Sequence, residues 1–208
     1  MKSSILRAGV VALACALGLS ACGGGSGDLY LSGAVYNVTK DGLVLQNNGG
    51  DDTNVVSPYT TFQFGNRVST DDQFNITVKS IPSNAKECVV NNGKARANYY
   101  TIGQISVTCT IKQHALTAVI KNLTGSGLVI INGADRQNVS VDAKTVQMAM
   151  VNEGAAYGVT VLQQPTGQTC TVTGGYIDPN KPGDVGNGTG TMGPDENTTV
   201  TVTCTPAP

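Results

Sequence analysis

The chain has 208 residues with 13 basic and 14 acidic side chains, so its formal net charge is −1 and only 13% of its residues are charged. No run of Lys or Arg occurs in the sequence, which argues against nucleic acid as a partner. Val, Thr, Gly and Asn are abundant and no long stretch has helical periodicity, so the composition predicts an all-β fold with many turns.

The N-terminus has the pattern of an exported protein. Lys2 and Arg7 flank the start of an almost wholly apolar run at 8–19, which is shorter than the about 20 residues that a transmembrane helix needs. The sequence Leu-Ser-Ala-Cys follows at 19–22. This segment resembles the cleavage site of bacterial lipoprotein precursors, which makes Cys22 the expected lipidation site. The alternative is an ordinary secretory signal with a chance cysteine at the cleavage point.

The lipoprotein resemblance divides the N-terminal segment into two parts. It implies a signal peptide at 1–21 and a lipidated tether at 22–28, whose Gly/Ser-rich sequence is typical of a flexible linker. Acyl chains on the cysteine would attach the mature protein to a membrane. Gly23 stands where an Asp would favour retention at the inner membrane. The resemblance therefore implies the outer membrane, with the protein on the cell surface or on the periplasmic face.

The remaining cysteines predict disulfides. Cys15 leaves with the signal peptide and Cys22 carries the lipid, so four cysteines remain, an even number in an exported chain. Four cysteines allow three pairings among Cys88, Cys109, Cys170 and Cys204. A structural zinc site is a poor alternative because the chain has no C-x-x-C pair and one histidine.

The mature chain contains two copies of one unit, with a period of about 83–85 residues. Three segments recur in the same order: DGLVLQNNGGDD at 41–52 and SGLVIINGADRQ at 126–137, FNITVKSIPSNAKEC at 74–88 and YGVTVLQQPTGQTC at 157–170, and ISVTC at 105–109 and VTVTC at 200–204. We therefore expect two domains, at 29–112 and 113–208. Because each copy owns two cysteines, the repeat selects the pairs Cys88–Cys109 and Cys170–Cys204.

Alternation of apolar and polar residues within each copy predicts short, half-buried strands. In the segment at 73–80, Ile76 and Val78 alternate with polar neighbours, and Val159 and Val161 repeat this pattern in the second copy. About seven strands per copy indicate a β-sandwich. In the first copy they are expected at 30–38, 43–46, 54–57, 60–64, 73–80, 87–91 and 104–111.

These motifs together resemble a small immunoglobulin-like repeat found in exported proteins and lipoproteins of proteobacteria. The second copy carries the whole pattern, whereas the first has SIPSNAKECVV in place of the QPxGQxCTV segment. The resemblance implies two tandem immunoglobulin-like β-sandwich domains. The chain differs from antibody domains because it has no Trp and because the cysteines of each pair are closer in sequence. We expect each disulfide to join the last two strands of its domain.

Catalysis and metal binding have little support in the sequence. His114 lies between the copies and is expected to be a solvated linker residue, no G-x-S-x-G elbow occurs, and the acids are scattered. We predict no enzyme, no cofactor and no metal. The alternative of calcium binding concerns the acidic loops around 47–52 and around Asp184, Asp195 and Glu196. Such loops are also what ordinary turns require.

Two apolar groups are candidates for contact with a partner. The insertion at 174–198 is the most individual part of the chain, and long loops on rigid sandwiches often carry recognition. It offers Tyr176, Ile177 and Met192, and the matching loop of the first copy offers Tyr99 and Tyr100. The alternative is a surface loop without a partner.

The sequence as a whole predicts a monomeric, non-catalytic lipoprotein with a structural, adhesive or protein-interaction role. The linker at 110–116 contains no Gly or Pro, so the domains should lie end to end. The partner would be an unidentified protein or glycan, and the resemblance implies a surface antigen if the protein is exposed. The alternative is a carbohydrate- or small-ligand-binding module, against which the aromatic content of 5% counts.

Overall fold

A computed structural model describes residues 29–58, 60–175, 180, 183–194 and 197–208. The predicted lipidation site Cys22, the signal peptide and the tether lie outside these residues, as do Tyr176 and Ile177. Within the described part, no helix is long and apolar enough to cross a membrane.

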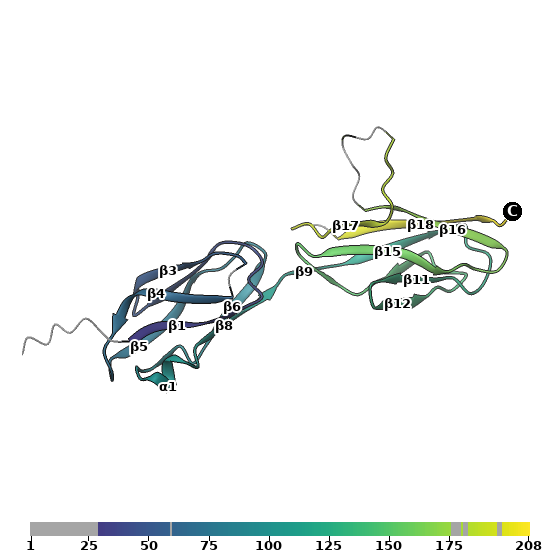
Figure 1. The fold of residues 1–208 in the computed structure, drawn as a ribbon. Helices are drawn as coiled ribbons and strands as arrows, with labels where there is room; N and C mark the ends of the chain where they lie inside the picture. The colour runs from purple at the N-terminus through teal and green to yellow at the C-terminus, as the bar shows by residue number, and fades with distance from the viewer. Residues whose placement is uncertain (1–28, 59, 176–179, 181–182, 195–196) are drawn as a thin grey trace, which may run out of the picture.

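The first domain is a sandwich of two four-stranded sheets (Figure 1). One sheet has the order β4-β1-β8-β6 and consists of β1 (Leu29–Tyr36), β4 (Thr61–Val68), β6 (Ala85–Asn91) and β8 (Ser106–Ile111). The other has the order β3-β2-β5-β7 and consists of β2 (Leu43–Asn47), β3 (Gly50–Val55), β5 (Gln73–Ser80) and β7 (Lys94–Arg96). A short helix, α1 (Tyr99–Ile102), connects β7 to β8.

The second domain repeats this topology, strand for strand. Its sheet β13-β10-β18-β16 contains β10 (Leu116–Lys121), β13 (Thr145–Gln147), β16 (Gln168–Gly174) and β18 (Thr198–Pro206). Its sheet β12-β11-β15-β17 contains β11 (Val129–Asn132), β12 (Asp135–Asn138), β15 (Ala156–Gln163) and β17 (Thr189–Thr191). In each domain the first strand pairs in parallel with the last, β1 with β8 and β10 with β18. The predicted all-β fold with two tandem sandwiches is confirmed.

The cores follow from the predicted alternation. On β5, Phe74 and Ile76 are buried while their neighbours are exposed, and on β15 Tyr157 and Val159 occupy the equivalent positions. Each domain has its own cluster of buried apolar side chains between its two sheets. Burying a side chain such as Phe or Ile stabilises the fold by about 1.5–3 kcal/mol, so these clusters hold the sheets together.

The two disulfides have the predicted pairing. Cys88 on β6 lies directly opposite Cys109 on β8, and Cys170 on β16 lies opposite Cys204 on β18. Each bond therefore ties two neighbouring strands of one sheet and does not cross the core. The expectation that each disulfide joins the last two strands of its domain is wrong, because the unpredicted strands β7 and β17 lie between the bonded strands along the chain.

The third strand differs from its prediction. It was expected at 54–57, but β3 begins at Gly50 and forms a hairpin with β2. Asn48 and Gly49 have positive φ angles of 52° and 74°, which Asn and Gly adopt readily and tight hairpin turns require. The Asn-Gly pair thus places the turn earlier than expected, and Asp51 and Asp52 lie in the strand and not in a loop.

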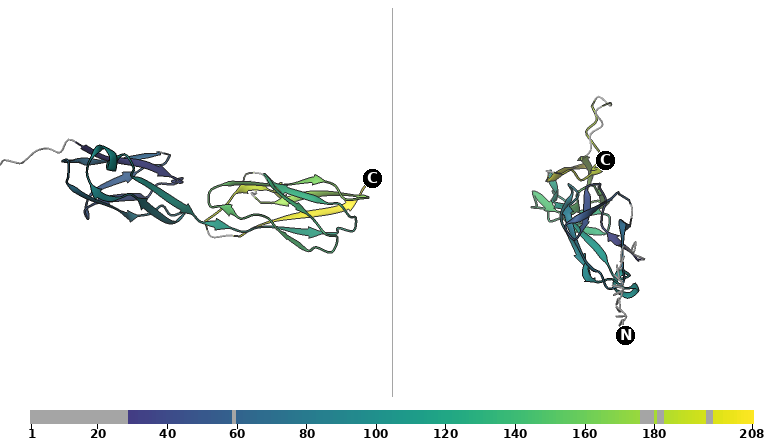
Figure 2. Two further views of the ribbon diagram at one scale, coloured as in Figure 1. Left: turned by 90° about the horizontal axis from the view of Figure 1, so that it is seen from below. Right: turned by 90° about the vertical axis from the view of Figure 1, so that its left-hand side faces the viewer.

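A short two-stranded sheet lies at the junction of the domains, which lie end to end in views at right angles (Figures 1 and 2). The sheet pairs β9 (Gln113–His114) with β14 (Val151–Asn152). The backbone N–H of Lys112 donates to Asn84 of the first domain at 2.9 Å, and its carbonyl accepts from Glu153 of the second at 2.8 Å. The predicted solvated linker histidine is wrong, because pairing with β14 leaves the His114 side chain only 16% exposed.

Candidate functional site

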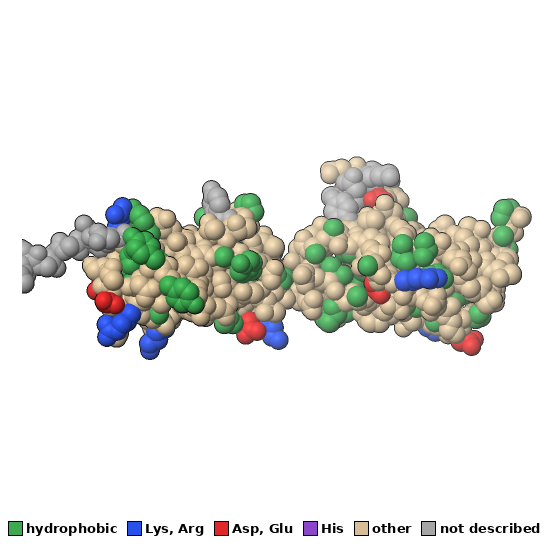
Figure 3. All heavy atoms as spheres, turned by 60° about the horizontal axis from the view of Figure 1, so that its bottom comes forward, with side chains coloured by type: hydrophobic (Ala, Val, Ile, Leu, Met, Phe, Trp, Pro, Cys, Tyr) green, Lys and Arg blue, Asp and Glu red, His purple; other side chains and the backbone are tan. Residues whose placement is uncertain are grey.

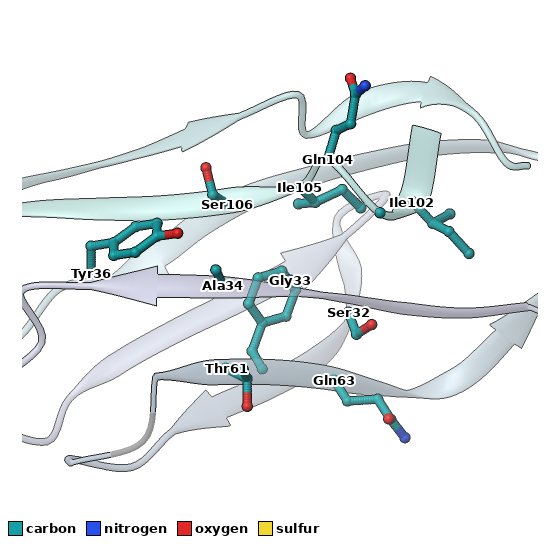
Figure 4. A pocket seen from close by; sticks show the side chains of 12 residues that line it. Ser32, Gly33, Ala34, Tyr36, Thr61, Gln63, Ile102, Gln104, Ile105 and Ser106 are labelled. Carbon is teal, nitrogen blue, oxygen red and sulfur yellow. The ribbon is translucent and has the colours of Figure 1, made fainter. Parts of the chain in front are cut away.

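A groove of about 720 Å³ opens on the first domain, on the face of the sheet β4-β1-β8-β6. This volume lies within the range of small-ligand sites. The groove runs across β1, between β4 on one side and the chain from α1 to β8 on the other (Figure 4). Its lining residues are Ser32, Gly33, Ala34, Tyr36, Thr61, Phe62, Gln63, Ile102, Gly103, Gln104, Ile105 and Ser106.

The groove lies where the two copies differ in strand pairing. In the first domain, β1 pairs with β8 only over Ala34–Tyr36. In the second domain, the equivalent strands β10 and β18 pair along the whole of Leu116–Lys121. The chain before β8 is folded into α1 and a turn, so the first half of β1 has no strand beside it on that side. The second domain has no such gap between its first and last strands.

Local capping fixes the helix that replaces the missing strand segment. The Asn98 side chain accepts hydrogen bonds from the backbone N–H groups of Tyr100 and Thr101, both at 3.0 Å. The Thr101 hydroxyl accepts from the Asn98 N–H at 3.1 Å and donates to the Arg96 carbonyl at 2.7 Å. This capping box satisfies N–H groups that a helix start leaves unpaired. It presents Tyr99 and Tyr100 to solvent, 83% and 74% exposed.

The groove is lined by neutral polar groups and two aromatic residues, Tyr36 and the buried Phe62. Tyr36 stands at one end, half exposed, with its hydroxyl directed toward Ser106 and Ala34 (Figure 4). Gln63 and Gln104 stand on opposite rims (Figure 4). None of the described residues that line the groove is charged. On the face shown in Figure 3, charged side chains are likewise few.

The floor depends on a glycine. A Cβ atom on Gly33 would lie 2.4 Å from the carbonyl oxygen of Ile105 and 2.7 Å from the Phe62 ring. Both distances are too short for real contacts, so the close approach of β1, β4 and the residues before β8 requires a residue without a side chain. Gly33 and the other groove residues have no motif that marks them in the sequence. The signal that could have found them is the mismatch of the two copies just before the last strand.

The structure separates the residues predicted to contact a partner. Tyr99 and Tyr100 are exposed on α1, near the groove but not in its lining. The prediction that Met192 faces a partner is wrong. Its side chain is 1% exposed and packs in the core of the second domain. Its backbone exchanges hydrogen bonds with Gly154 and Ala155, which turns the side chain inward. The insertion was expected to match the loop of the first copy that carries Tyr99 and Tyr100. The two segments are not equivalent, because the long part of the insertion precedes β17 whereas α1 follows the equivalent strand, β7.

A second polar site lies at the domain junction. Glu153 is 3% exposed, and its carboxylate accepts a hydrogen bond at 3.0 Å from Lys40, which belongs to the first domain. His114 Nε2 lies 3.7 Å from the other carboxylate oxygen. Burial acts to raise the pKa of Glu153, but the hydrogen bond and charge of Lys40, with Lys112 and His114, outweigh it and hold the pKa below its ordinary value.

The described residues contain no group of three or more His, Cys, Asp and Glu side chains that could hold a metal ion. At the acidic turn proposed as a calcium alternative, Asp52 forms an ion pair with Lys79 across the sheet. Asp195 and Glu196 of the other acidic loop lie outside the described residues. His114, the one histidine, has its Nε2 atom beside the buried carboxylate of Glu153.

No protein-family model and no curated protein matches the chain. Among solved structures, the chain is similar to two B repeat units of the collagen-binding protein of Staphylococcus aureus, with 14% identity over 86% of this chain and a TM-score of 0.29. The match spans 49% of that chain, so this protein covers about half of its length. It is also similar to the major pilin protein T-13 of Streptococcus pyogenes, with 10% identity over 86% of this chain and 97% of that one, and a TM-score of 0.30. The assignment of two sandwiches rests on the strand pairing described above.

Proposed function

We propose that this protein is a monomeric, membrane-anchored lipoprotein with a non-catalytic, structural and adhesive role. In this proposal Cys22 carries the lipid, and the two domains form a rod that holds a binding surface away from the outer membrane. The domain junction is the observation that carries the proposal. An adhesive spacer needs domains that keep a fixed relation, and a chain with free hinges would not provide one.

Four contacts support a stiff junction. The linker backbone is hydrogen-bonded to the first domain through Asn84 and to the second through Glu153. The Lys40–Glu153 ion pair bridges the domains at a buried carboxylate. Gln113 Nε2 also donates to the Asn152 side chain at 3.0 Å. Backbone pairing on both sides removes the freedom that a solvated linker would have.

The anchor is tested by replacing Cys22 with Ser. We expect Cys22→Ser to move the protein from the membrane fraction to the soluble fraction with both disulfides intact, because neither disulfide involves this residue. Cys15→Ser, a change in the part of the signal peptide that is removed, is the matched control and should leave the protein at the membrane. Retention of the Cys22→Ser protein in the membrane fraction would contradict the lipid anchor.

The display of the rod is tested by protease treatment of intact cells, with antibodies against the second domain. Loss of that domain would establish exposure at the surface, where an adhesive role is possible. Full protection would place the rod in the periplasm and overturn the adhesive part of the proposal. Lysed cells provide the control for protease access.

A further inference from the structure

We propose that the groove on the first domain is a binding site for a neutral oligosaccharide. This inference rests on the adhesive role proposed above and names the class of ligand. It is carried by the gap between β1 and β8, by the uncharged lining, and by the half-exposed Tyr36 at the end of the groove.

The charge of the lining selects against ionic ligands. Phosphates, sulfated glycans and acidic peptides are bound most strongly through charge-assisted hydrogen bonds from Lys or Arg side chains, and basic ligands through carboxylates. The described lining supplies neither. The cation–π contact of Arg67 with the Tyr30 ring, 4.2 Å from the guanidinium carbon to the ring centroid, involves two residues outside the lining. A ligand without charge is therefore the best match.

The polar groups match the hydroxyl groups of a sugar. The amides of Gln63 and Gln104 each offer two N–H donors and one carbonyl acceptor, and Ser32 and Ser106 add hydroxyls that both donate and accept. A sugar ring presents adjacent hydroxyls that need donors and acceptors in this mixture. Its C–H face is apolar and packs on an aromatic ring, for which Tyr36 is available.

A peptide added as a strand fits the gap less well. By the alternation of hydrogen bonding along β1, Ser32 and Ala34 direct their backbone groups toward the gap. The N–H of Ala34 already donates to the Ile105 carbonyl at 3.2 Å. A bulge between Tyr30 and Ser32 interrupts the edge beyond. The free edge is thus about one residue long, which gives too few backbone hydrogen bonds for strand addition.

The groove is open, so a single site should bind weakly. Shallow sites bury only part of their ligand, and ligand affinity falls with the buried contact. Many copies anchored in one membrane would compensate, because linked weak sites bind a polyvalent surface more tightly than any single site. The proposed rod is suited to such a use.

The experiment uses residues 23–208, which retain every residue that the structure describes. Maltotriose, cellotriose and triacetylchitotriose are titrated to about 10 mM while backbone and Gln side-chain amide signals are followed by NMR. We expect one trisaccharide to shift the signals of Ser32, Gln63 and 103–106 in a saturable way. We expect Tyr36→Ala and Gln104→Ala each to weaken binding by about 3- to 10-fold.

Two matched controls locate the site. Leu162→Ala removes an exposed apolar side chain of the second domain and should leave the affinity unchanged. Tyr100→Ala removes an exposed tyrosine of α1 that does not line the groove and should change the affinity less than twofold. Tyr36 and Gln104 are exposed, so both variants should fold, and their thermal unfolding is compared with that of the parent chain.

The inference is overturned if no trisaccharide shifts the groove signals, if Tyr100→Ala weakens binding and Tyr36→Ala does not, or if an uncharged extended peptide competes for the same signals and the sugars do not bind. Its failure is distinct from that of the proposed function. Surface display without sugar binding would refute the proposed sugar site alone. Sugar binding, together with retention of the Cys22→Ser protein in the membrane fraction, would refute the proposed lipid anchor alone.

Discussion

Glu153 shows how a single buried charge can join two domains. Its carboxylate lies in the second domain, but its closest partner, Lys40, belongs to the first. A buried ion that loses its partner keeps the cost of its desolvation, so removing Lys40 should be more harmful than removing an exposed lysine. The Lys79–Asp52 pair, with both side chains about half exposed, provides the comparison within the same chain.

We expect Lys40→Met to lower the free energy of unfolding by about 1–3 kcal/mol, a value reduced from that of a fully buried pair because Lys40 is partly exposed. Lys79→Met, the matched control, should change it by less than about 0.5 kcal/mol. Urea unfolding measures both values. Equal losses in the two variants would show that the junction pair has no special role.

The same carboxylate makes the junction sensitive to acid. The pKa of Glu153 is lower in the folded chain than its ordinary value of 4.5, so the unfolded chain binds more protons. The contribution of Glu153 to stability is therefore complete above about pH 4.5. It is lost as the pH falls through the lower pKa that Glu153 has in the folded chain. We expect the stability difference between the parent chain and Glu153→Gln to be larger at pH 7 than at pH 3, as measured by thermal unfolding. A difference that grows toward pH 3 would contradict the assignment.

Gly33 is the residue on which the groove floor depends. We expect Gly33→Ala to destabilise the first domain by about 1–3 kcal/mol, because the new methyl group would meet the Ile105 carbonyl and the Phe62 ring. Gly65→Ala on the neighbouring strand β4 is the control, since a Cβ there has no atom within 4 Å. Gly65→Ala should be neutral or slightly stabilising, as measured by thermal unfolding. A neutral Gly33→Ala would show that β1 and β4 can separate without cost.

At the level of secondary-structure elements, the disulfides differ in exposure although their topology is the same. Cys88 is only partly buried, whereas Cys170 and Cys204 are 3% and 1% exposed. Reduction requires access of a thiolate to one sulfur atom. A loop of 21 or 34 residues contributes about 3–4 kcal/mol in the chain-entropy model, so the domain that loses its bond first is destabilised first.

We therefore expect a mild thiol reductant to open Cys88–Cys109 before Cys170–Cys204. Alkylation of the released thiols followed by peptide mass mapping measures the order. In urea, where both domains are unfolded, the two bonds should be reduced at similar rates. Preferential opening of Cys170–Cys204 in the native chain would refute this explanation.

The sequence was informative wherever local pattern decides structure. The alternation around Ile76 and Val159 predicted strands that the structure contains, and the internal repeat predicted both disulfides. The prediction that Met192 is exposed was wrong, because an apolar residue in a long loop can pack inward or outward and only tertiary contacts decide which.

The groove could not be predicted from the sequence for a related reason. Tyr36 and Gln104 are 68 positions apart and line the same groove only because β1 and β8 pair in parallel. Pairing between the first and last strands of a domain leaves no local pattern. The Lys40–Glu153 contact was missed in the same way, since it joins loops of different domains, 113 positions apart.

At the scale of the whole molecule, the strand directions set the direction of the rod. In each domain the first and last strands run parallel, so the chain enters at one end and leaves at the opposite end. The two domains are therefore stacked head to tail, and the described chain begins and ends at opposite tips (Figure 2). An antiparallel arrangement of these strands would have brought both chain ends to one side.

This strand arrangement has a mechanical consequence. When the ends of the rod are pulled apart, the first and last strands of each domain slide past each other in shear, and their hydrogen bonds must break together. The first domain resists with the short pairing of Ala34–Tyr36, the second with the longer pairing of Leu116–Lys121. Single-molecule stretching should therefore rupture the first domain at the lower force, and the disulfide should keep the loop between Cys88 and Cys109 from extending until it is reduced. Rupture of the second domain first would show that the parallel strands do not bear the load.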